Sequence, residues 1–285
     1  PPAQPEDAEE PKDADQPEDD DQKNAEESEN DEEQKDADRQ ENTDRKESAE
    51  EPEDADRKES AGQQAQPQQA APAAAPVAST PVKYWKNTIT VINNFADKVL
   101  NLTLKDVKID VSNTGRENHA GKAALSVQGE GNVEIELDGN NELKSGVQRA
   151  GLEKNTSTST GTLTLKDDKE AGSGSLKATG GKYGAGIGGG NYGSGENITI
   201  TGGRVNATGG WGSAGIGGGN YGRGNYGSGK NITIKGGTVT AKGGDCGAGI
   251  GGGNGGIGEN IKITDGTVTA TGGIHGAGIC LLYTS

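Results

Sequence analysis

Short stretches of alternating aliphatic and polar residues predict β-strands from about residue 88 to residue 279. In Ile198-Thr-Ile200 and Val205-Asn-Ala207, aliphatic side chains occupy one face and polar side chains the other. Glycine pairs such as Gly202-Gly203 separate the stretches, and glycine tolerates the positive φ angles that sharp corners need. The pattern therefore predicts short strands joined by tight corners.

These stretches recur at a regular interval. The phrase Ala-Gly-Ile begins at residues 185, 214, 248 and 277, so its spacings are 29, 34 and 29 residues. The five extra residues come from a duplicated Asn-Tyr-Gly turn. Three strands and three corners per unit describe one rung of a parallel β-helix, in which equivalent residues stack roughly 4.8 Å apart. We therefore predict an all-β, right-handed parallel β-helix (solenoid), preceded by a disordered acidic segment.

The repeats predict two halves in this solenoid. Residues 82–178 alternate without regular glycine corners and are expected to form an N-terminal cap followed by irregular rungs. The expected plugs of this cap are Trp85, Phe95 and the Val91-Ile92 pair. Residues 179–279 form the glycine-rich 29-residue repeats. Asparagines recur at two corners of each unit and are expected to stack into hydrogen-bonded ladders. They are Asn197, Asn231 and Asn260 at one corner and Asn191, Asn220 and Asn254 at the other.

Charge separates the solenoid from the segment before it. Residues 1–60 carry 27 acidic and 8 basic side chains, whereas the remaining residues carry 17 and 20. A segment with this much negative charge and so few apolar residues cannot bury enough surface to offset the chain entropy lost on folding. The sequence therefore predicts a disordered acidic stalk at 1–60. Residues 61–81 are rich in Ala, Pro and Gln and are expected to form a linker. The stalk would repel phosphates, so no nucleic-acid partner is expected.

The two ends of the sequence suggest a fragment. Without any methionine, the chain is expected to start inside a longer product, and no signal peptide is visible. Residues 280–285 match the translation of a sequencing adapter and are interpreted as an artefact. Cys246 then has no partner for an intrachain disulfide, which suits a bacterial extracellular protein. No apolar run approaches the roughly 18 residues of a membrane helix, so no membrane insertion is visible.

Several segments resemble a known family. Asn101-Leu-Thr-Leu-Lys-Asp-Val107, residues 125–133 and 137–143, and the Ala-Gly-Ile-Gly-Gly-Gly repeats are similar to the carbohydrate-binding-domain β-helix proteins of anaerobic gut bacteria. The resemblance spans residues 98–279. It implies a secreted or cell-surface protein that binds extracellular polysaccharide, and it leaves calcium possible as a cofactor. No residue is assigned a role from it.

Aromatic residues in the glycine-rich corners are the candidate binding residues. None occupies an inward strand position, and exposed rings offer flat apolar faces on which sugar rings stack. Tyr192 and Tyr221 lie 29 residues apart and are expected to stack on successive rungs. The alternative is that the rings shield glycine turns or pack on each other. The candidates are Tyr183, Tyr192, Trp211, Tyr221 and Tyr226.

Other patterns point away from catalysis and metal binding. Residues 184–189 match G-x-G-x-x-G, but no helix-forming segment follows to hold a nucleotide phosphate. Asp245 and Asp265 have no acidic counterpart in the neighbouring rungs, whereas polysaccharide cleavage needs clustered carboxylates. Cys246 and His275 share a column but complete no metal site, and the repeats lack the aspartate of calcium-binding nonapeptides. We expect no enzyme activity, no cofactor and no metal site.

The sequence therefore predicts an extracellular, non-catalytic polysaccharide-binding β-helix protein of a bacterial cell surface. The alternative is an adhesin or structural surface-fibre protein without glycan binding. The two differ in whether the tyrosines of the corners contribute to glycan affinity. Nothing in the sequence indicates the oligomeric state.

Overall fold

The computed structural model describes residues 81–169, 173–220 and 226–280. The predicted stalk at 1–60 and nearly all of the predicted linker lie outside the described residues, as do Tyr221 and residues 281–285. All regular secondary structure within the described part is β, and none of it is helical.

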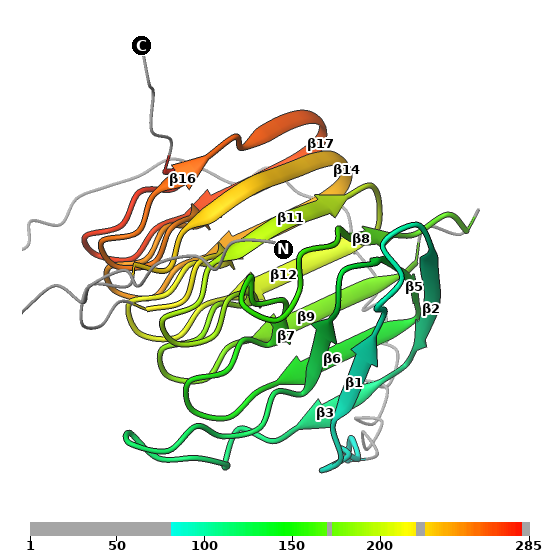
Figure 1. Cartoon of the computed structure of the whole chain (residues 1–285), viewed down its shortest axis with the longest axis horizontal. Coiled ribbons are helices and arrows are strands. Elements are labelled where there is room, and N and C mark those ends of the chain that lie inside the picture. Colours follow the sequence, from blue (N-terminus) through cyan, green and yellow to red (C-terminus); the bar gives the residue numbers. More distant parts are fainter. Residues whose placement is uncertain (1–80, 170–172, 221–225, 281–285) are drawn as a thin grey trace, which may run out of the picture. The chain divides into compact units, whose positions relative to one another are not determined.

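The strands stack in three parallel columns (Figure 1). Column A contains β1 (Ile89–Ile92), β4 (Leu125–Gln128), β7 (Leu152–Glu153), β10 (Ile187–Gly188), β13 (Ile216–Gly217) and β15 (Ile250–Gly251). Column B contains β2 (Val99–Lys105), β5 (Asn132–Asp138), β8 (Leu163–Lys166), β11 (Gly195–Ile200), the first half of β14 (Gly229–Lys242) and β16 (Gly258–Glu259). Column C contains β3 (Lys108–Asp110), β6 (Asn140–Lys144), β9 (Ser175–Thr179), β12 (Arg204–Thr208), the second half of β14 and most of β17 (Lys262–Thr271).

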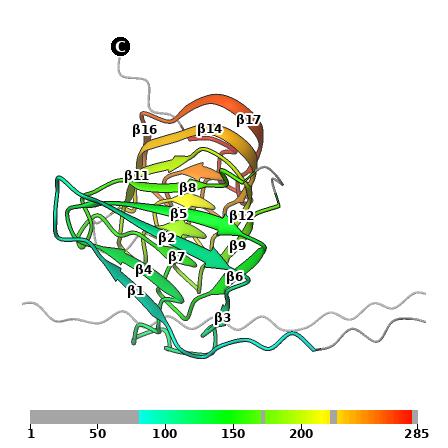
Figure 2. The same ribbon diagram turned by 90° about the vertical axis from the view of Figure 1, so that its right-hand side faces the viewer.

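Each rung passes through columns A, B and C in turn, and Figure 2 shows successive rungs one above another. The ladders pair parallel strands from neighbouring rungs. The predicted parallel β-helix is confirmed.

The interior is built from stacked aliphatic side chains. In column B, Ile198 pairs in register with Leu163 on one side and with Ile232 on the other, and all three are fully buried. In column C, Ala207 lies in register with Ala178 and Ala241. Each fully buried large aliphatic side chain contributes roughly 1.5–3 kcal/mol. Because only alternate strand residues point inward, a chain with 28% hydrophobic residues can still fill a continuous core.

The glycine of the Ala-Gly-Ile phrase lies where column A meets the end of column C. A Cβ atom added to Gly186 would lie 2.5 Å from the backbone nitrogen of Thr208, and one added to Gly215 would lie 2.6 Å from that of Lys242. Real Cβ contacts are not this short, so a larger residue would push the two backbones apart. The phrase therefore recurs once per rung because the backbones approach so closely there.

One of the two predicted asparagine ladders is present. The side-chain nitrogen of Asn231 donates to Oδ1 of Asn197 at 3.0 Å, and that of Asn260 donates to Oδ1 of Asn231 at 3.1 Å. The φ angles of Asn197, Asn231 and Asn260 lie between 52° and 56°, a region that asparagine adopts more readily than most residues. No such bond joins the described side chains of the other predicted set, and Asn220 is instead buried at its corner.

The first rung is closed by backbone rather than by aromatic rings. The backbone nitrogen of Trp85 donates to the carbonyl of Lys108 at 2.8 Å, and that of Asp110 donates to the carbonyl of Trp85 at 3.0 Å. The Trp85 side chain is nevertheless 60% exposed and that of Phe95 is 69% exposed. Of the expected plug, Trp85, Phe95 and Ile92 are therefore largely exposed, whereas Val91 is buried in the core.

Candidate functional site

Two of the predicted aromatic residues meet at the corner between columns C and A. The rings of Tyr183 and Trp211 come from successive rungs and pack edge to face, with centroids 5.6 Å apart and planes at 81°. Trp211 remains 46% exposed. The Lys182 ammonium lies 5.0 Å from the centre of the Tyr183 ring, within the range of a cation–π interaction. The pair is thus partly packed and partly open to solvent.

A hollow of about 320 Å³ lies beside this pair, and we call it the first hollow. Tyr192 joins Tyr183 and Trp211 in its lining, which makes three of the five predicted residues. The remaining lining is one carboxylate, Glu117, and a set of side-chain amides. These amides belong to Asn118, Gln148, Asn191 and Asn220.

The tyrosines of the first hollow have an unusual backbone. Tyr183 has a φ of 75° and Tyr192 a φ of 61°, in the left-handed region that bulky residues rarely adopt. Glycine stands at the equivalent position in one other rung each, Gly212 for Tyr183 and Gly255 for Tyr192, both with a φ of 69°. Holding a bulky side chain in this conformation costs on the order of 1–3 kcal/mol, and such strain concentrates at functional sites. The fold accepts glycine at both positions, so its geometry does not require the tyrosines.

A second hollow of about 370 Å³ adjoins the first, because Asn191 and Tyr192 line both. Its other lining residues include Asn155, Ser194 and Glu196. Tyr192 is 51% exposed and therefore offers ring surface at the junction of the two hollows.

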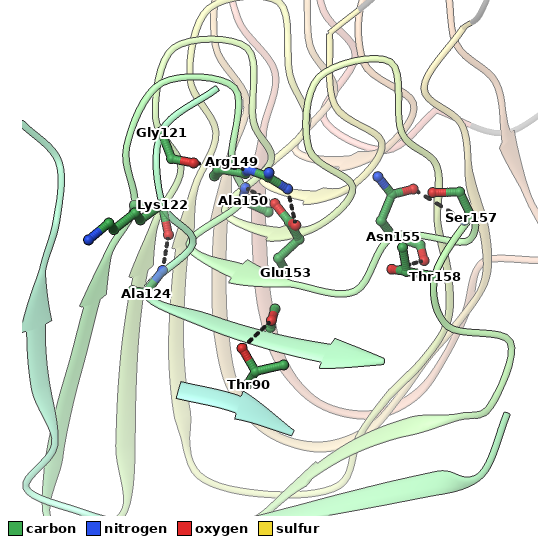
Figure 3. A network of polar contacts seen from close by, with 12 residues as sticks. Thr90, Gly121, Lys122, Ala124, Arg149, Ala150, Glu153, Asn155, Ser157 and Thr158 are labelled. Carbon is green, nitrogen blue, oxygen red and sulfur yellow. Dashed lines mark hydrogen bonds and ion pairs between the residues drawn. The ribbon is translucent and has the colours of Figure 1, made fainter. Parts of the chain in front are cut away.

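A third hollow of about 560 Å³ shares Thr156 and Ser157 with the second. These residues belong to the loop 154–162, which joins column A to column B and is longer than the equivalent corner of the preceding rung. Figure 3 shows Asn155, Ser157 and Thr158 together on this loop. The side-chain oxygen of Asn155 accepts from the backbone nitrogen of Ser157 at 3.4 Å, and the Thr158 hydroxyl donates to the Asn155 carbonyl at 3.1 Å. The loop thus presents hydroxyl and amide groups to both hollows.

Buried charges lie beneath this surface. Burial lowers the pKa of Lys154 from 10.5 to about 8, with the Glu196 carboxylate acting in the opposite direction. Burial raises the pKa of Glu153, opposed by the Arg149 guanidinium, whose nitrogen lies 2.9 Å from the carboxylate. Figure 3 shows these two side chains pointing toward one another. Nearer the surface, hydrogen bonding from Lys182 lowers the pKa of Glu117.

Of the five predicted residues, Tyr226 stands outside this arrangement. Tyr226 is 51% exposed and lies against Gly255 of the next rung, where its ring would meet an added Cβ at 2.5 Å. It lines none of the three hollows. Tyr221 is not among the described residues, so its expected stacking on Tyr192 stays a prediction.

Three segments of the chain, residues 198–220, 232–254 and 261–279, match the family model described as a beta helix repeat. Each match starts in column B, crosses column C and ends at or beyond an Ala-Gly-Ile phrase. This chain is a parallel β-helix protein. No curated protein and no solved structure matches it. Beta-helix repeats occur both in enzymes and in proteins without catalytic activity, so the match leaves the chemistry open.

The irregular rungs of this β-helix supply site residues that the sequence did not reveal. Gln148 lines the first hollow with a φ of 68° and stands at the position that Tyr183 occupies one rung later. The signal was available in Ala150-Gly-Leu152, a variant of Ala-Gly-Ile whose Leu152 pairs with Ile187. Glu117 and the loop 154–162 carry no such signal, because they lie in corners of irregular length.

Two features are absent from the described residues. No helix there is long and apolar enough to cross a membrane. No group of three or more His, Cys, Asp or Glu side chains is placed to hold a metal ion. What the hollows do offer is exposed aromatic surface beside neutral hydrogen-bonding groups.

Proposed function

We propose that this chain is an extracellular, non-catalytic polysaccharide-binding protein, secreted by or attached to a bacterial cell. The observation that carries the proposal is the occurrence of Tyr183 and Tyr192 at left-handed positions that hold glycine in another rung, Gly212 and Gly255. A strained, partly exposed ring is destabilising unless it serves a purpose, and surface aromatics are well suited to stacking on sugar rings. The resemblance to carbohydrate-binding β-helix proteins supports the same function.

The groups around the rings suit a sugar ligand. Amide side chains such as Gln148 and Asn191 can donate to and accept from hydroxyl groups, and they stand beside the aromatic rings in the first hollow. Small-molecule sites commonly combine apolar faces with a few polar groups that fix orientation. Trp211 and Tyr192 would supply the faces, and the amides would fix the orientation.

The carboxylates of the hollows support binding without cleavage. Each described hollow is lined by a single carboxylate: Glu117, Glu196 or Glu130. Glycoside hydrolysis usually needs two carboxyl groups on opposite sides of the scissile bond. We propose that the protein holds its polysaccharide without a reaction and without a cofactor.

The test is a glycan array with the full chain, followed by Tyr192→Gly on any ligand found. Glycine fits the φ of 61°, so the variant should be as stable as the wild type or more stable. Loss of the ring should nevertheless weaken binding about tenfold, the equivalent of one stacking contact. Tyr226→Ala is the matched control, since this exposed tyrosine lines none of the three hollows. A calcium chelator should leave binding unchanged.

Absence of binding to plant, host and microbial glycans by a folded sample would overturn the proposal. The alternative, an adhesin or structural surface-fibre protein, would then be preferred. Equal loss of binding in Tyr192→Gly and Tyr226→Ala would also contradict the site, because only one of these residues lines the first hollow.

A further inference from the structure

The three hollows adjoin one another along the side of the β-helix. Tyr192 lines the first and second hollows, and Thr156 lines the second and third. Their lining residues come from corners of several rungs, from Asn94 near β1 to Asn220 after β13. A ligand that followed all three would therefore be an extended chain rather than a single sugar.

The lining of this series is polar but carries no basic side chain among the described residues. Glu117, Glu196 and Glu130 provide one carboxylate for each hollow in turn. An anionic ligand gains its strongest contacts from lysine or arginine, and burial beside a carboxylate leaves its charge unpaired. Glu117 is already paired with Lys182, and Glu196 interacts electrostatically with Lys154. The series of hollows therefore offers few unpaired carboxylates to a cationic polymer either.

Two buried polar atoms without partners mark the ends of the series. Asn220 lines the first hollow, and its Oδ1 accepts no hydrogen bond from the described residues. Ser159 lines the third hollow, and its Oγ also has no described partner. The residues are 4% and 2% exposed, and buried polar groups of this kind are normally satisfied by water or a ligand. Both are neutral side chains, so neither adds a charge to the wall of its hollow.

We propose that the three hollows form one groove for an uncharged polysaccharide chain, which it selects over uronic-acid polymers. The inference rests on the proposed function and specifies its ligand class. Aromatic rings hold the chain at one end of the groove, and the hydroxyls of the loop 154–162 hold it further along. An anionic chain in the same place sets its carboxylates near Glu130 and Glu196, and the lysines beside Glu196, Lys154 and Lys230, already interact with carboxylates of the protein.

The experiment measures binding of the full chain to neutral polymers and to carboxylated polymers of the same backbone, such as hydroxyethyl and carboxymethyl cellulose. The panel includes glucans, xylans and mannans. We expect the carboxylated partner of any bound polymer to bind at least about tenfold more weakly, the effect of one unpaired charge. We also expect neutral oligosaccharides to gain affinity with length beyond what the first hollow can hold.

Measurement at high salt separates the groove from the acidic residues 1–60. At roughly 1 M salt the screening length falls to about 3 Å, so long-range repulsion is lost while an unpaired charge inside the groove still weakens binding. Glu130→Lys should then raise affinity for the carboxylated polymer about threefold or more. Asp265→Lys makes the same charge change on β17, away from the groove, and should have no effect.

Three outcomes would overturn the inference. Equal or tighter binding of the carboxylated polymer would leave polysaccharide binding intact and remove the selectivity. A preference for the neutral polymer could also vanish at high salt, or change equally in Glu130→Lys and Asp265→Lys. Either result would show that the preference comes from the net charge of the chain and not from the groove. No binding to any polymer would instead remove the proposed function itself, and this inference with it.

Discussion

The buried side chain of Lys154 lowers the stability of the folded state. It has no exposed surface, and its ammonium donates one hydrogen bond of 3.2 Å to the carbonyl of Ser159. Burial therefore lowers its pKa from 10.5 to about 8. A buried lysine with one described hydrogen bond destabilises the folded state at neutral pH, where it is protonated.

Replacing this lysine should stabilise the protein in a pH-dependent way. Between about pH 8 and pH 10.5 the unfolded state binds more protons at Lys154 than the folded state, so the free energy of unfolding rises with pH across that window. Lys154→Met removes the ammonium and should raise the free energy of unfolding at pH 7 by up to about 3 kcal/mol. This gain should shrink steadily above pH 8.

Denaturant titrations of both proteins from pH 7 to pH 10.5 test this prediction. Lys235→Met serves as the control, because Lys235 is exposed. A gain for Lys154→Met that does not change with pH would show that packing, rather than a buried charge, separates the two proteins.

The stacked aliphatic side chains of column B stabilise the fold. Ile234 and Ile263 stand in register on successive strands of this ladder, yet Ile234 is fully buried and Ile263 is 41% exposed. Their chemistry is the same, and they differ in whether described strands flank them on both sides. A fully buried isoleucine leaves a cavity when it is truncated, whereas an exposed one leaves little.

Alanine substitutions in this column should therefore differ sharply. Ile234→Ala should lower the free energy of unfolding by about 2–5 kcal/mol, and Ile263→Ala by about 1 kcal/mol or less. Denaturant unfolding of both variants at one pH is the measurement. Equal losses would mean that β17 is covered in solution as fully as β14.

Over the whole β-helix, stability should vary with the number of neighbouring rungs. β11 pairs with β8 and β14, whereas β17 pairs with β14 alone among the described strands. In a solenoid each rung contacts only its neighbours, so a rung flanked on one side opens more easily. The core is not expected to open as a single unit.

Hydrogen exchange followed by mass spectrometry tests this gradient. Peptides covering residues 262–271 should exchange many times faster than those covering residues 195–200, because local opening of β17 breaks fewer contacts. Uniform exchange across both segments would indicate global, cooperative unfolding.

Much of the fold and part of the candidate site could be predicted from particular residues. The alternation in Ile198-Thr-Ile200 and the 29-residue spacing were sufficient to predict the parallel columns. The recurrence of Asn231 at one corner was sufficient to predict one asparagine ladder. Tyr183, Tyr192 and Trp211 were identified as a possible surface and do line one hollow. Gln148 was missed, because its rung carries leucine where the later rungs carry isoleucine.

The sequence by itself determined the period, the inward-facing residues and the stacking of equivalent positions. These follow from local geometry repeated at a fixed interval, so no long-range information is needed. Only the tertiary structure decided that Glu117, Thr156 and Asn220 belong to one series of hollows. They lie far apart in the sequence, and irregular corner lengths set which of them come together as the rungs stack.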